Sequence, residues 1–308
     1  MSGNRRTVLR GVRWVALAAT GILSLGVVQV VTSSGASAAG AVRRVTGTSV
    51  QSVAAKSLTV QCPVGWTATG GFAATDAPAG VHIDQIWPRD RVVTIHATPL
   101  PTVTAGWRIT GGAICVADTA DIQYVQSTAA TLTRSLDGDR RFGKAVFVDC
   151  PGGKELIGFG ATAVGARLAG LQPIGPGVPY TSDPSNATYQ HGVSALAKAY
   201  TAGRPTASLR GMAVCANRGH GSKVQFAEVH SATALKNTTV SCPAGTQTRA
   251  VGTIIMYPNH YEELTDFSFA VVESFDSAAD TTAGVWSRRR ADNIPVEKWL
   301  LATYGLCA

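Results

Sequence analysis

Charged residues are scarce in this chain of 308 residues. Asp, Glu, Lys and Arg together make up 15% of it, against roughly 25% in an average soluble protein. Apolar residues make up 45%, so the chain can bury a substantial core, and extensive disorder is not expected. The composition also excludes a collagen, a coiled coil and a protein with a strongly acidic tail. It does not by itself point to an activity.

Several motifs that carry chemistry are missing as well. The sequence has no C-x2-C pair and no H-E-x-x-H, as zinc sites would require, and no G-x-S-x-G elbow or Walker loop. Asp137-Gly138-Asp139 lacks the further spaced oxygens of a calcium loop and is interpreted as a turn. We therefore expect no metal and no cofactor. The histidines are expected at surface or loop positions; they are His82, His96, His191, His220, His230 and His260.

A basic and then apolar stretch opens the chain. Four Arg and no acidic residue lie within residues 1–13, an apolar run follows from Trp14 to Val31, and Ala36-Ser37-Ala38 comes shortly after it. This order is typical of a secretory signal peptide that is cleaved after Ala38. Arg5-Arg6-Thr7-Val8-Leu9-Arg10 resembles a twin-arginine export signal. An ordinary secretory signal and an uncleaved anchor are the alternatives, because 18 residues could just span a bilayer.

Cleavage would halve the positive charge of the protein. The whole chain carries a net charge of +8, and removal of the four leader Arg leaves +4. So small a charge is a poor basis for nucleic-acid binding, and no nucleic-acid partner is expected. No second apolar run is long enough to span a membrane. We expect a secreted protein, extracellular or associated with the cell wall, without a stable membrane span after cleavage.

One pattern occurs three times after the leader. Each occurrence opens with the same type of tetrapeptide: Cys62-Pro63-Val64-Gly65, Cys150-Pro151-Gly152-Gly153 and Cys242-Pro243-Ala244-Gly245. Each ends with an apolar stretch that runs into Cys115, Cys215 or Cys307. Such an internal repeat determines how the whole fold is interpreted. We divide the chain into the leader 1–38 and three copies, the first at 39–118, the second at 119–218 and the third at 219–308.

The repeat favours one disulfide pairing among the fifteen that six cysteines allow. Identical units should close in the same way, and an exported chain meets an oxidising environment. This predicts the pairs Cys62–Cys115, Cys150–Cys215 and Cys242–Cys307. The paired cysteines would be 53, 65 and 65 residues apart in the sequence. For loops of this length the chain-entropy model predicts roughly 4 kcal/mol of stabilisation per bridge. No free thiol would remain as a nucleophile.

The local pattern is that of strands. Ser57 to Cys62 and Asp266 to Val271 alternate at period two, as half-buried strands do. In Cys-Pro-x-Gly, Pro cannot donate a backbone hydrogen bond and Gly supplies a turn conformation, so a strand should end at the first cysteine. We predict an all-β protein with three pseudo-repeats, each of about five or six antiparallel strands with one internal disulfide.

These motifs resemble two groups of proteins. The first resemblance, over residues 45–308, is to a repeat of secreted actinobacterial proteins of unknown function. It rests on the order of a strand, Cys-Pro-x-Gly, a Gly-rich strand and a closing strand that ends in Cys-Ala. Three units that each open with Cys-Pro-x-Gly and end at Cys resemble, more distantly, vitelline membrane outer layer protein I. That resemblance implies a β-prism, although the copies here are longer and lack the acidic segment before the closing cysteine. Three tandem β-sandwich-like units are the alternative arrangement.

Aromatic residues give the strongest indication of binding. Trp87 and Trp286 lie near predicted turns beside charged residues, and Tyr257 and Tyr261 form a further aromatic group in the third copy. An exposed aromatic ring beside polar groups can stack on a sugar or anchor a protein partner. Trp107 and Trp299 each precede a closing cysteine by eight residues and are expected in the core. The second copy also has two insertions, Leu132 to Lys144 and Leu171 to Thr188, of the kind in which functional loops occur.

Three functional hypotheses remain. The first is a secreted, non-catalytic binding module of a Gram-positive bacterium, with cell-wall glycan or polymer as ligand. The second is a structural or protein-interaction component of the cell or spore surface. The third is a hydrolase, and glycoside hydrolysis would need two suitably spaced carboxylates, for which Asp84, Glu262, Glu263 and Glu273 are candidates. No catalytic residue is assigned, and the aromatic residues above are the proposed binding site.

Overall fold

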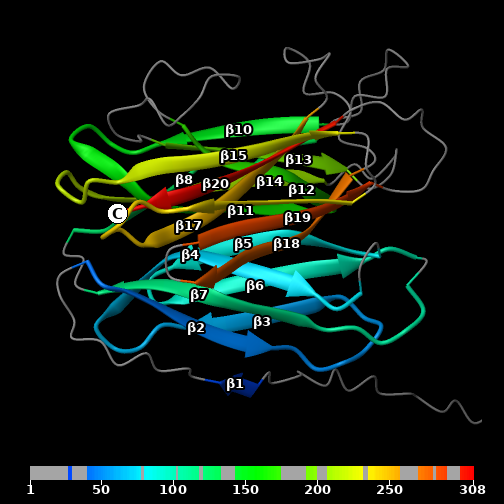
Figure 1. Cartoon of the computed structure of the whole chain (residues 1–308). Coiled ribbons are helices and arrows are strands. Elements are labelled where there is room, and N and C mark those ends of the chain that lie inside the picture. The colour runs from blue at the N-terminus through cyan, green and yellow to red at the C-terminus, as the bar shows by residue number, and fades with distance from the viewer. Residues whose placement is uncertain are drawn as a thin grey trace, which may run out of the picture.

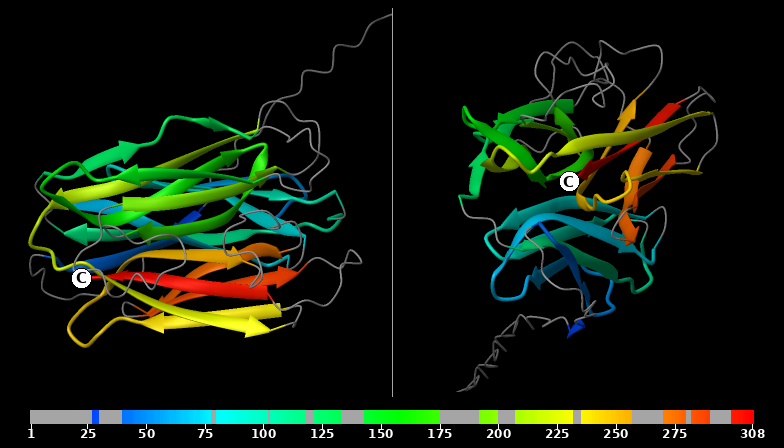
Figure 2. Two further views of the ribbon diagram at one scale, coloured as in Figure 1. Left: turned by 90° about the horizontal axis from the view of Figure 1, so that it is seen from above. Right: turned by 60° about the vertical axis from the view of Figure 1, so that its left-hand side comes forward.

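The chain folds into three antiparallel β-sheets, as the computed structural model shows (Figures 1 and 2). The structure describes residues 27–29, 40–77, 80–101, 103–117, 121–132, 143–174, 192–199, 207–231, 235–256, 270–279, 282–289 and 299–308. The predicted all-β class is confirmed. Within this part of the chain, no helix has the length and hydropathy needed to cross a lipid bilayer.

The copies contribute six, seven and six described strands, and the second copy adds the short β9 to an otherwise common order. The first copy holds β2 (Val42–Thr48), β3 (Lys56–Gln61), β4 (Trp66–Thr75), β5 (Val81–Arg89), β6 (Val92–Pro99) and β7 (Ile109–Ala117). The second holds β8 (Gln123–Gln126), the short β9 (Ala130–Thr131), β10 (Gly143–Asp149), β11 (Lys154–Val164), β12 (Ala166–Ile174), β13 (Gly192–Ala199) and β14 (Ser208–Asn217). The third holds β15 (Lys223–Ser231), β16 (Leu235–Ser241), β17 (Thr248–Met256), β18 (Ala270–Ala279), β19 (Thr282–Arg289) and β20 (Trp299–Cys307).

Each sheet is shared by two copies. Sheet 1 has the order β1-β2-β7-β4-β18-β19-β16, where β1 (Val27–Gln29) lies within the apolar run of the leader. Sheet 2 has the order β3-β6-β5-β11-β14-β8, and sheet 3 the order β10-β13-β12-β17-β20-β15. The copies therefore join through three equivalent strand pairs, β4–β18, β11–β5 and β12–β17. In the right-hand view of Figure 2 the three copies, coloured blue to cyan, green, and yellow to red, occupy three sides of the molecule.

The Cys-Pro-x-Gly tetrapeptides form one turn, repeated three times. The backbone N–H of the residue after each glycine donates to the carbonyl of the proline, as in Trp66 to Pro63 and Lys154 to Pro151. The final glycine has a positive φ in every copy, 80° at Gly65, 87° at Gly153 and 83° at Gly245. Glycine adopts this left-handed conformation without steric cost. The tetrapeptide therefore ends one strand and starts the next, as the sequence predicts.

The three predicted disulfides are confirmed, and each joins two different sheets. The bridges are Cys62–Cys115, Cys150–Cys215 and Cys242–Cys307. Cys62 follows β3 of sheet 2, whereas Cys115 lies in β7 of sheet 1. The described cysteines include no free thiol. Each bridge thus ties together the two halves of a copy that lie in different sheets.

The copies share a single large core. One cluster of buried apolar residues takes members from all three sheets, among them Val45, Ile95, Phe159, Leu209 and Leu301. Tandem sandwiches would each close on their own strands, and here every sheet continues from one copy into the next. This sharing favours the prism-like arrangement. Trp107 is fully buried, as expected, and the side chain of Trp299 lies outside the described residues.

Candidate functional site

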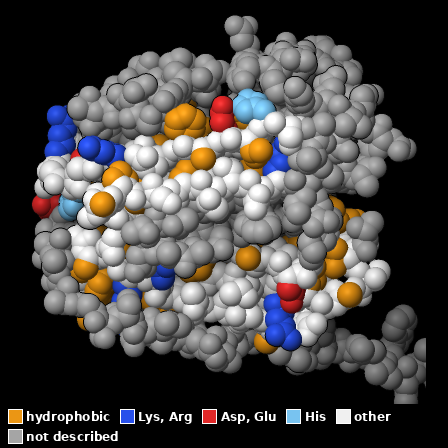
Figure 3. All heavy atoms as spheres, viewed as in Figure 1, with side chains coloured by type: hydrophobic (Ala, Val, Ile, Leu, Met, Phe, Trp, Pro, Cys, Tyr) orange, Lys and Arg blue, Asp and Glu red, His pale blue; other side chains and the backbone are white. Residues whose placement is uncertain are grey.

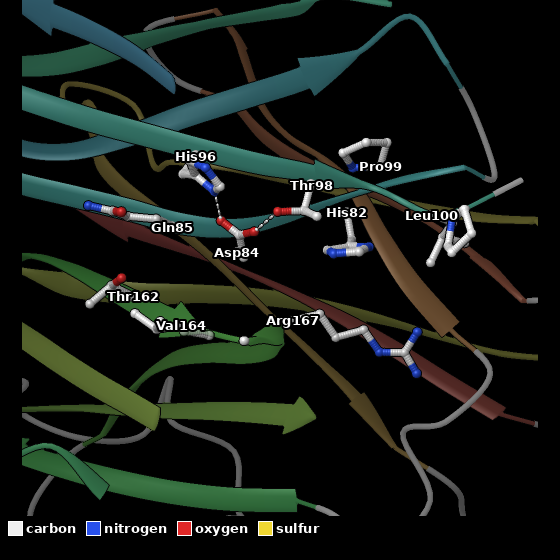
Figure 4. Close-up of a pocket in the computed structure, with 13 residues that line it drawn as sticks. His82, Asp84, Gln85, His96, Thr98, Pro99, Leu100, Thr162, Val164 and Arg167 are labelled. Carbon is white, nitrogen blue, oxygen red and sulfur yellow. Dashed lines mark hydrogen bonds and ion pairs between the residues drawn. The ribbon is translucent and has the colours of Figure 1, made fainter. Parts of the chain in front are cut away.

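A β-bulge in β5 positions a buried carboxylate. The pairing of β5 with β6 shifts register between Ile83 and Gln85, so Asp84 is the additional residue of β5. Bulges redirect a side chain locally and occur near functional sites. Asp84 is 4% exposed. Its Oδ1 lies 2.5 Å from Nδ1 of His96, and its Oδ2 accepts a hydrogen bond of 2.6 Å from the hydroxyl of Thr98 (Figure 4).

The alternation of β6 brings both partners of Asp84 to one face. His96 and Thr98 are two residues apart, and side chains at this spacing point to the same side of a strand. His96 is paired with Gln85 across β5 and with Ser57 across β3. The side chain of His96 is 37% exposed, whereas that of Asp84 is 6% exposed. The carboxylate is therefore buried behind an imidazole that reaches the surface.

The Asp84–His96 pair lines a cavity of 660 Å³ between the first and second copies, here called the junction cavity. Figure 4 shows its walls, with β5 and β6 on one side and the end of β11 and start of β12 on the other. This volume lies within the range of small-molecule sites. The lining residues are His82, Asp84, Gln85, His96, Thr98, Pro99, Leu100, Pro101, Thr162, Ala163, Val164, Gly165 and Arg167.

Basic side chains outnumber acidic ones in the cavity lining. The hydrogen bond from Asp84 raises the pKa of His96 above its ordinary value; burial opposes this shift, and the negative charge of Asp84 adds to it. His82 and Arg167 are both buried, at 1% and 4% exposure. Asp84 is the one carboxylate among these lining residues. A cavity with two imidazoles, a guanidinium and one engaged carboxylate is suited to bind polar and anionic groups.

The same bulge recurs in the other two copies with different residues. The register shifts between Leu168 and Gly170 in β12, and between Val272 and Ser274 in β18. In the second copy Ala169 and Leu196 stand at the register positions of Asp84 and His96. In the third copy Glu273 and Trp286 stand there. The bulge therefore belongs to the repeated architecture, whereas the buried Asp–His pair belongs to the first copy.

Of the sequence-predicted binding residues, Trp87 is the one whose side chain the structure describes. It is half-buried in β5, pairs with Thr94 and lies two residues from the cavity residue Gln85 on the same side of the strand. Trp286 lies in β19, paired with Asn237 and Ser274, and its side chain is outside the described residues. Tyr257 and Tyr261 are also outside them. The structure thus brings one predicted aromatic residue close to the junction cavity.

The expectation that the histidines lie on the surface or in loops was wrong for His82. This residue is buried in β5, and His96 lies in the neighbouring strand β6. Period-two spacing of His82 and Asp84, and of His96 and Thr98, was the available signal. This spacing could not show that the polar residues of β5 and β6 meet, because strand pairing and the bulge at Asp84 bring them together.

The features that hydrolase and metal chemistry would need are not assembled in the described structure. Glycoside hydrolysis requires a pair of carboxylates, and the junction cavity is lined by one. Glu262 and Glu263 lie outside the described residues. No group of three His, Cys, Asp or Glu that could hold a metal ion is found within the described ranges. Within the described residues, the junction cavity has a polar lining with more basic than acidic side chains.

Among the described residues on the face shown in Figure 3, basic side chains are dispersed. The Lys and Arg side chains that are coloured there lie in small separate groups among uncharged ones.

Comparison of the chain with known family models and with curated protein sequences finds no match.

Proposed function

We propose that this protein is exported and binds a cell-envelope glycan or wall polymer without catalysing a reaction, with the junction cavity and Trp87 as its binding surface. The observation that carries this proposal is the buried Asp84–His96 pair in a cavity of ligand size. Burial of an ionised carboxylate costs free energy unless it is paired. The second copy has Ala169 and Leu196 at the same register positions, so the fold does not need this polar pair. A binding role would explain its presence.

The surface beside the cavity suits an extended polar ligand. Outward-facing residues of β3 are Ser57, Thr59 and Gln61, all exposed. Across β6 and β5 they continue into Thr94 and Trp87. Hydroxyl and amide groups can form hydrogen bonds with sugar hydroxyls, and a Trp ring provides an apolar face with a polar edge. A glycan chain could therefore lie over Trp87 and reach into the cavity.

Export is supported by the leader and by the disulfides. The sequence of residues 1–38 has the order of a signal peptide, and three disulfides are typical of chains that fold in an oxidising compartment. The ligand would then be a component of the envelope or the medium.

Retention on insoluble polysaccharides tests this function. The oxidised protein, purified from the medium of an exporting host, is incubated with purified cell wall, chitin and cellulose, and affinity for soluble glycans is measured by calorimetry. We expect saturable binding that Trp87→Ala weakens about tenfold. This change corresponds to the loss of one aromatic contact that contributes roughly 1.4 kcal/mol. Phe147→Ala is the matched control, because Phe147 is an aromatic residue 48% exposed on β10 of the second copy. Equal binding by both variants would remove Trp87 from the site.

The strand edge at β2 favours a second function, a protein-interaction component of the surface. On its outer side β2 pairs with three residues of β1, Val27–Gln29, which belong to the leader. Loss of the leader would leave this edge open, and an open edge can add a strand from another chain. A hollow of 440 Å³ runs along it, lined by residues 46–51 and Arg108. Binding to a surface protein with flow-through from every glycan would support this function and exclude the first.

A further inference from the structure

We propose that the junction cavity binds the acidic group of a glycan, a carboxylate or a phosphate ester, with Nε2 of His96 as its contact. This inference rests on the proposed glycan-binding function and specifies the class of glycan. Both acidic groups present anionic oxygens to a single N–H donor, and the experiment below distinguishes them.

The geometry leaves one nitrogen of His96 for a ligand. Its Nδ1 is held at 2.5 Å by Oδ1 of Asp84, while the other carboxylate oxygen accepts from Thr98 (Figure 4). The imidazole is thereby fixed in orientation, as in other carboxylate–histidine pairs. With Nδ1 occupied, Nε2 is the ring atom that can bind a ligand group. The exposed fraction of the side chain, 37%, makes it accessible from the cavity.

Few charged groups face His96 from the surrounding strands. Its cross-strand neighbours are Ser57 on β3 and Gln85 on β5, and Thr162 of β11 pairs with Gln85. None of these titrates near neutral pH. The charged or titratable groups in the cavity lining are Asp84 and His82 on β5, and Arg167 on β12.

Protonation of His96 would change the net charge of the cavity. With His96 neutral, the Asp84–His96 pair carries one negative charge. With His96 protonated, the pair is neutral, so the cavity gains one unit of positive charge. An anionic oxygen would then accept a charge-assisted hydrogen bond from Nε2, which is about twice as strong as a neutral one. A sugar hydroxyl does not gain from this charge.

The direction of the pH dependence follows from the raised pKa of His96. Because Asp84 stabilises the protonated ring, the pKa of His96 lies above its ordinary value, and the imidazolium persists to higher pH. Affinity for an acidic glycan should be high below this pKa and fall as the pH rises through it. Affinity for a neutral glycan should change little over the same range.

Calorimetry at two pH values tests the inference. The exported, oxidised protein is titrated with oligogalacturonate, with a glycerol-phosphate polymer and with neutral dextran, at about pH 5.5 and about pH 8, on either side of an ordinary histidine pKa. Ionic strength is held constant to keep screening equal. At least one acidic probe should bind about tenfold more tightly at the lower pH, and dextran should not. Preference for oligogalacturonate or for the phosphate polymer identifies the acidic group.

Two variants and a matched control connect the effect to His96. His96→Gln should reduce the pH dependence to less than about twofold. Asp84→Asn removes the charge that raises the pKa, so the fall in affinity should move to lower pH. His230→Gln is the control, because His230 of β15 also pairs with a carboxylate, at 2.9 Å from Glu228, outside the junction cavity. It should keep the full pH dependence. Thermal unfolding verifies that each variant is folded.

The outcomes separate the two proposals. If neutral and acidic glycans bind equally at both pH values, the protein binds glycans but the inference is wrong. If acidic glycans bind and His96→Gln keeps the pH dependence, His96 is not the contact and the inference is again wrong. If no glycan binds at either pH, the proposed function and the inference both fail.

Discussion

The ammonium group of Lys56 stabilises a loop from inside the protein. Lys56 is 4% exposed, and its Nζ donates hydrogen bonds to the carbonyls of Ser52 and Ala54, at 2.8 and 2.7 Å. It also lies 4.5 Å from the centre of the Trp107 ring. Burial lowers the pKa of Lys56, so these contacts offset the cost of burying its charge.

The third copy repeats this arrangement. Lys236, 3% exposed, donates to the carbonyl of Ser231 at 2.7 Å, and burial lowers its pKa to about 8. Lys56 and Lys236 each precede the first cysteine of their copy by six residues, and Lys144 does so in the second copy. A buried cation therefore recurs at this position in the first and third copies.

Replacement of Lys56 should destabilise the protein. Lys56→Met removes a charged donor from the carbonyls of Ser52 and Ala54, and the carbonyl of Ser52 keeps the backbone N–H of Trp107 as a donor. It also removes the cation from the Trp107 ring. We expect the free energy of unfolding to fall by about 3 kcal/mol, measured by chemical denaturation with the disulfides intact. Lys223→Met, at an exposed position of β15, should change it by less than about 0.5 kcal/mol. Similar small changes in both variants would contradict a stabilising role for Lys56.

At the scale of elements, three equivalent bulges bring the copies into contact. The strand after each Cys-Pro-x-Gly turn shifts register seven residues beyond the cysteine, at Thr69, Ile157 and Arg249. All three residues are buried. The hydroxyl of Thr69 donates to the carbonyl of Arg249 at 2.9 Å, which joins β4 to β17. The carbonyl of Thr69 faces Gly158 of β11.

A methyl group at Gly158 should disrupt this contact. The Cβ of Gly158→Ala would overlap with the carbonyl oxygen of Thr69, and backbone atoms on both sides leave little room to move. We expect a loss of about 3 kcal/mol, as for overpacking in a core, observed as a lower midpoint of denaturation. Gly152→Ala is the control in the preceding turn, because nothing lies within 4 Å of its added Cβ. A tolerated Gly158→Ala would show that β4 and β11 can separate without loss of stability.

At the scale of the whole molecule, no copy closes its own sheets. Strands β4 and β5 of the first copy pair with β18 of the third and β11 of the second. Copies cut apart would expose these strand edges and the apolar faces of a shared core. Folding should therefore be cooperative over all three copies.

Denaturation should show one transition for the full chain. Circular dichroism and Trp fluorescence should give coincident curves, the usual sign of all-or-none unfolding. The isolated first copy, residues 39–118, should stay unfolded even when oxidised, because its disulfide cannot replace the missing sheet partners. Separate transitions, or a folded isolated copy, would mean that the copies are independent units.

The sequence alone determined the all-β class, the turns at Cys-Pro-x-Gly and the disulfide pairing, and it predicts the three copies. These properties are local or follow from repetition: alternation has a period of two, Pro and Gly restrict the backbone, and equivalent cysteines close equivalent units. Asp84 was a candidate carboxylate and Trp87 a candidate binding residue, because residue type and local context can be read directly from the sequence.

Only the tertiary structure decided which strands share a sheet and what lies in the junction cavity. The pairing of β5 with β11 depends on long-range contacts between copies, which leave no local signal. The register shift at Asp84 places it against His96 and Thr98, twelve and fourteen residues away. A shift of one residue turns side chains to the opposite face of a strand. The meeting of Asp84, His96 and Arg167 around one cavity is therefore a property of strand register and of the contact between the first two copies.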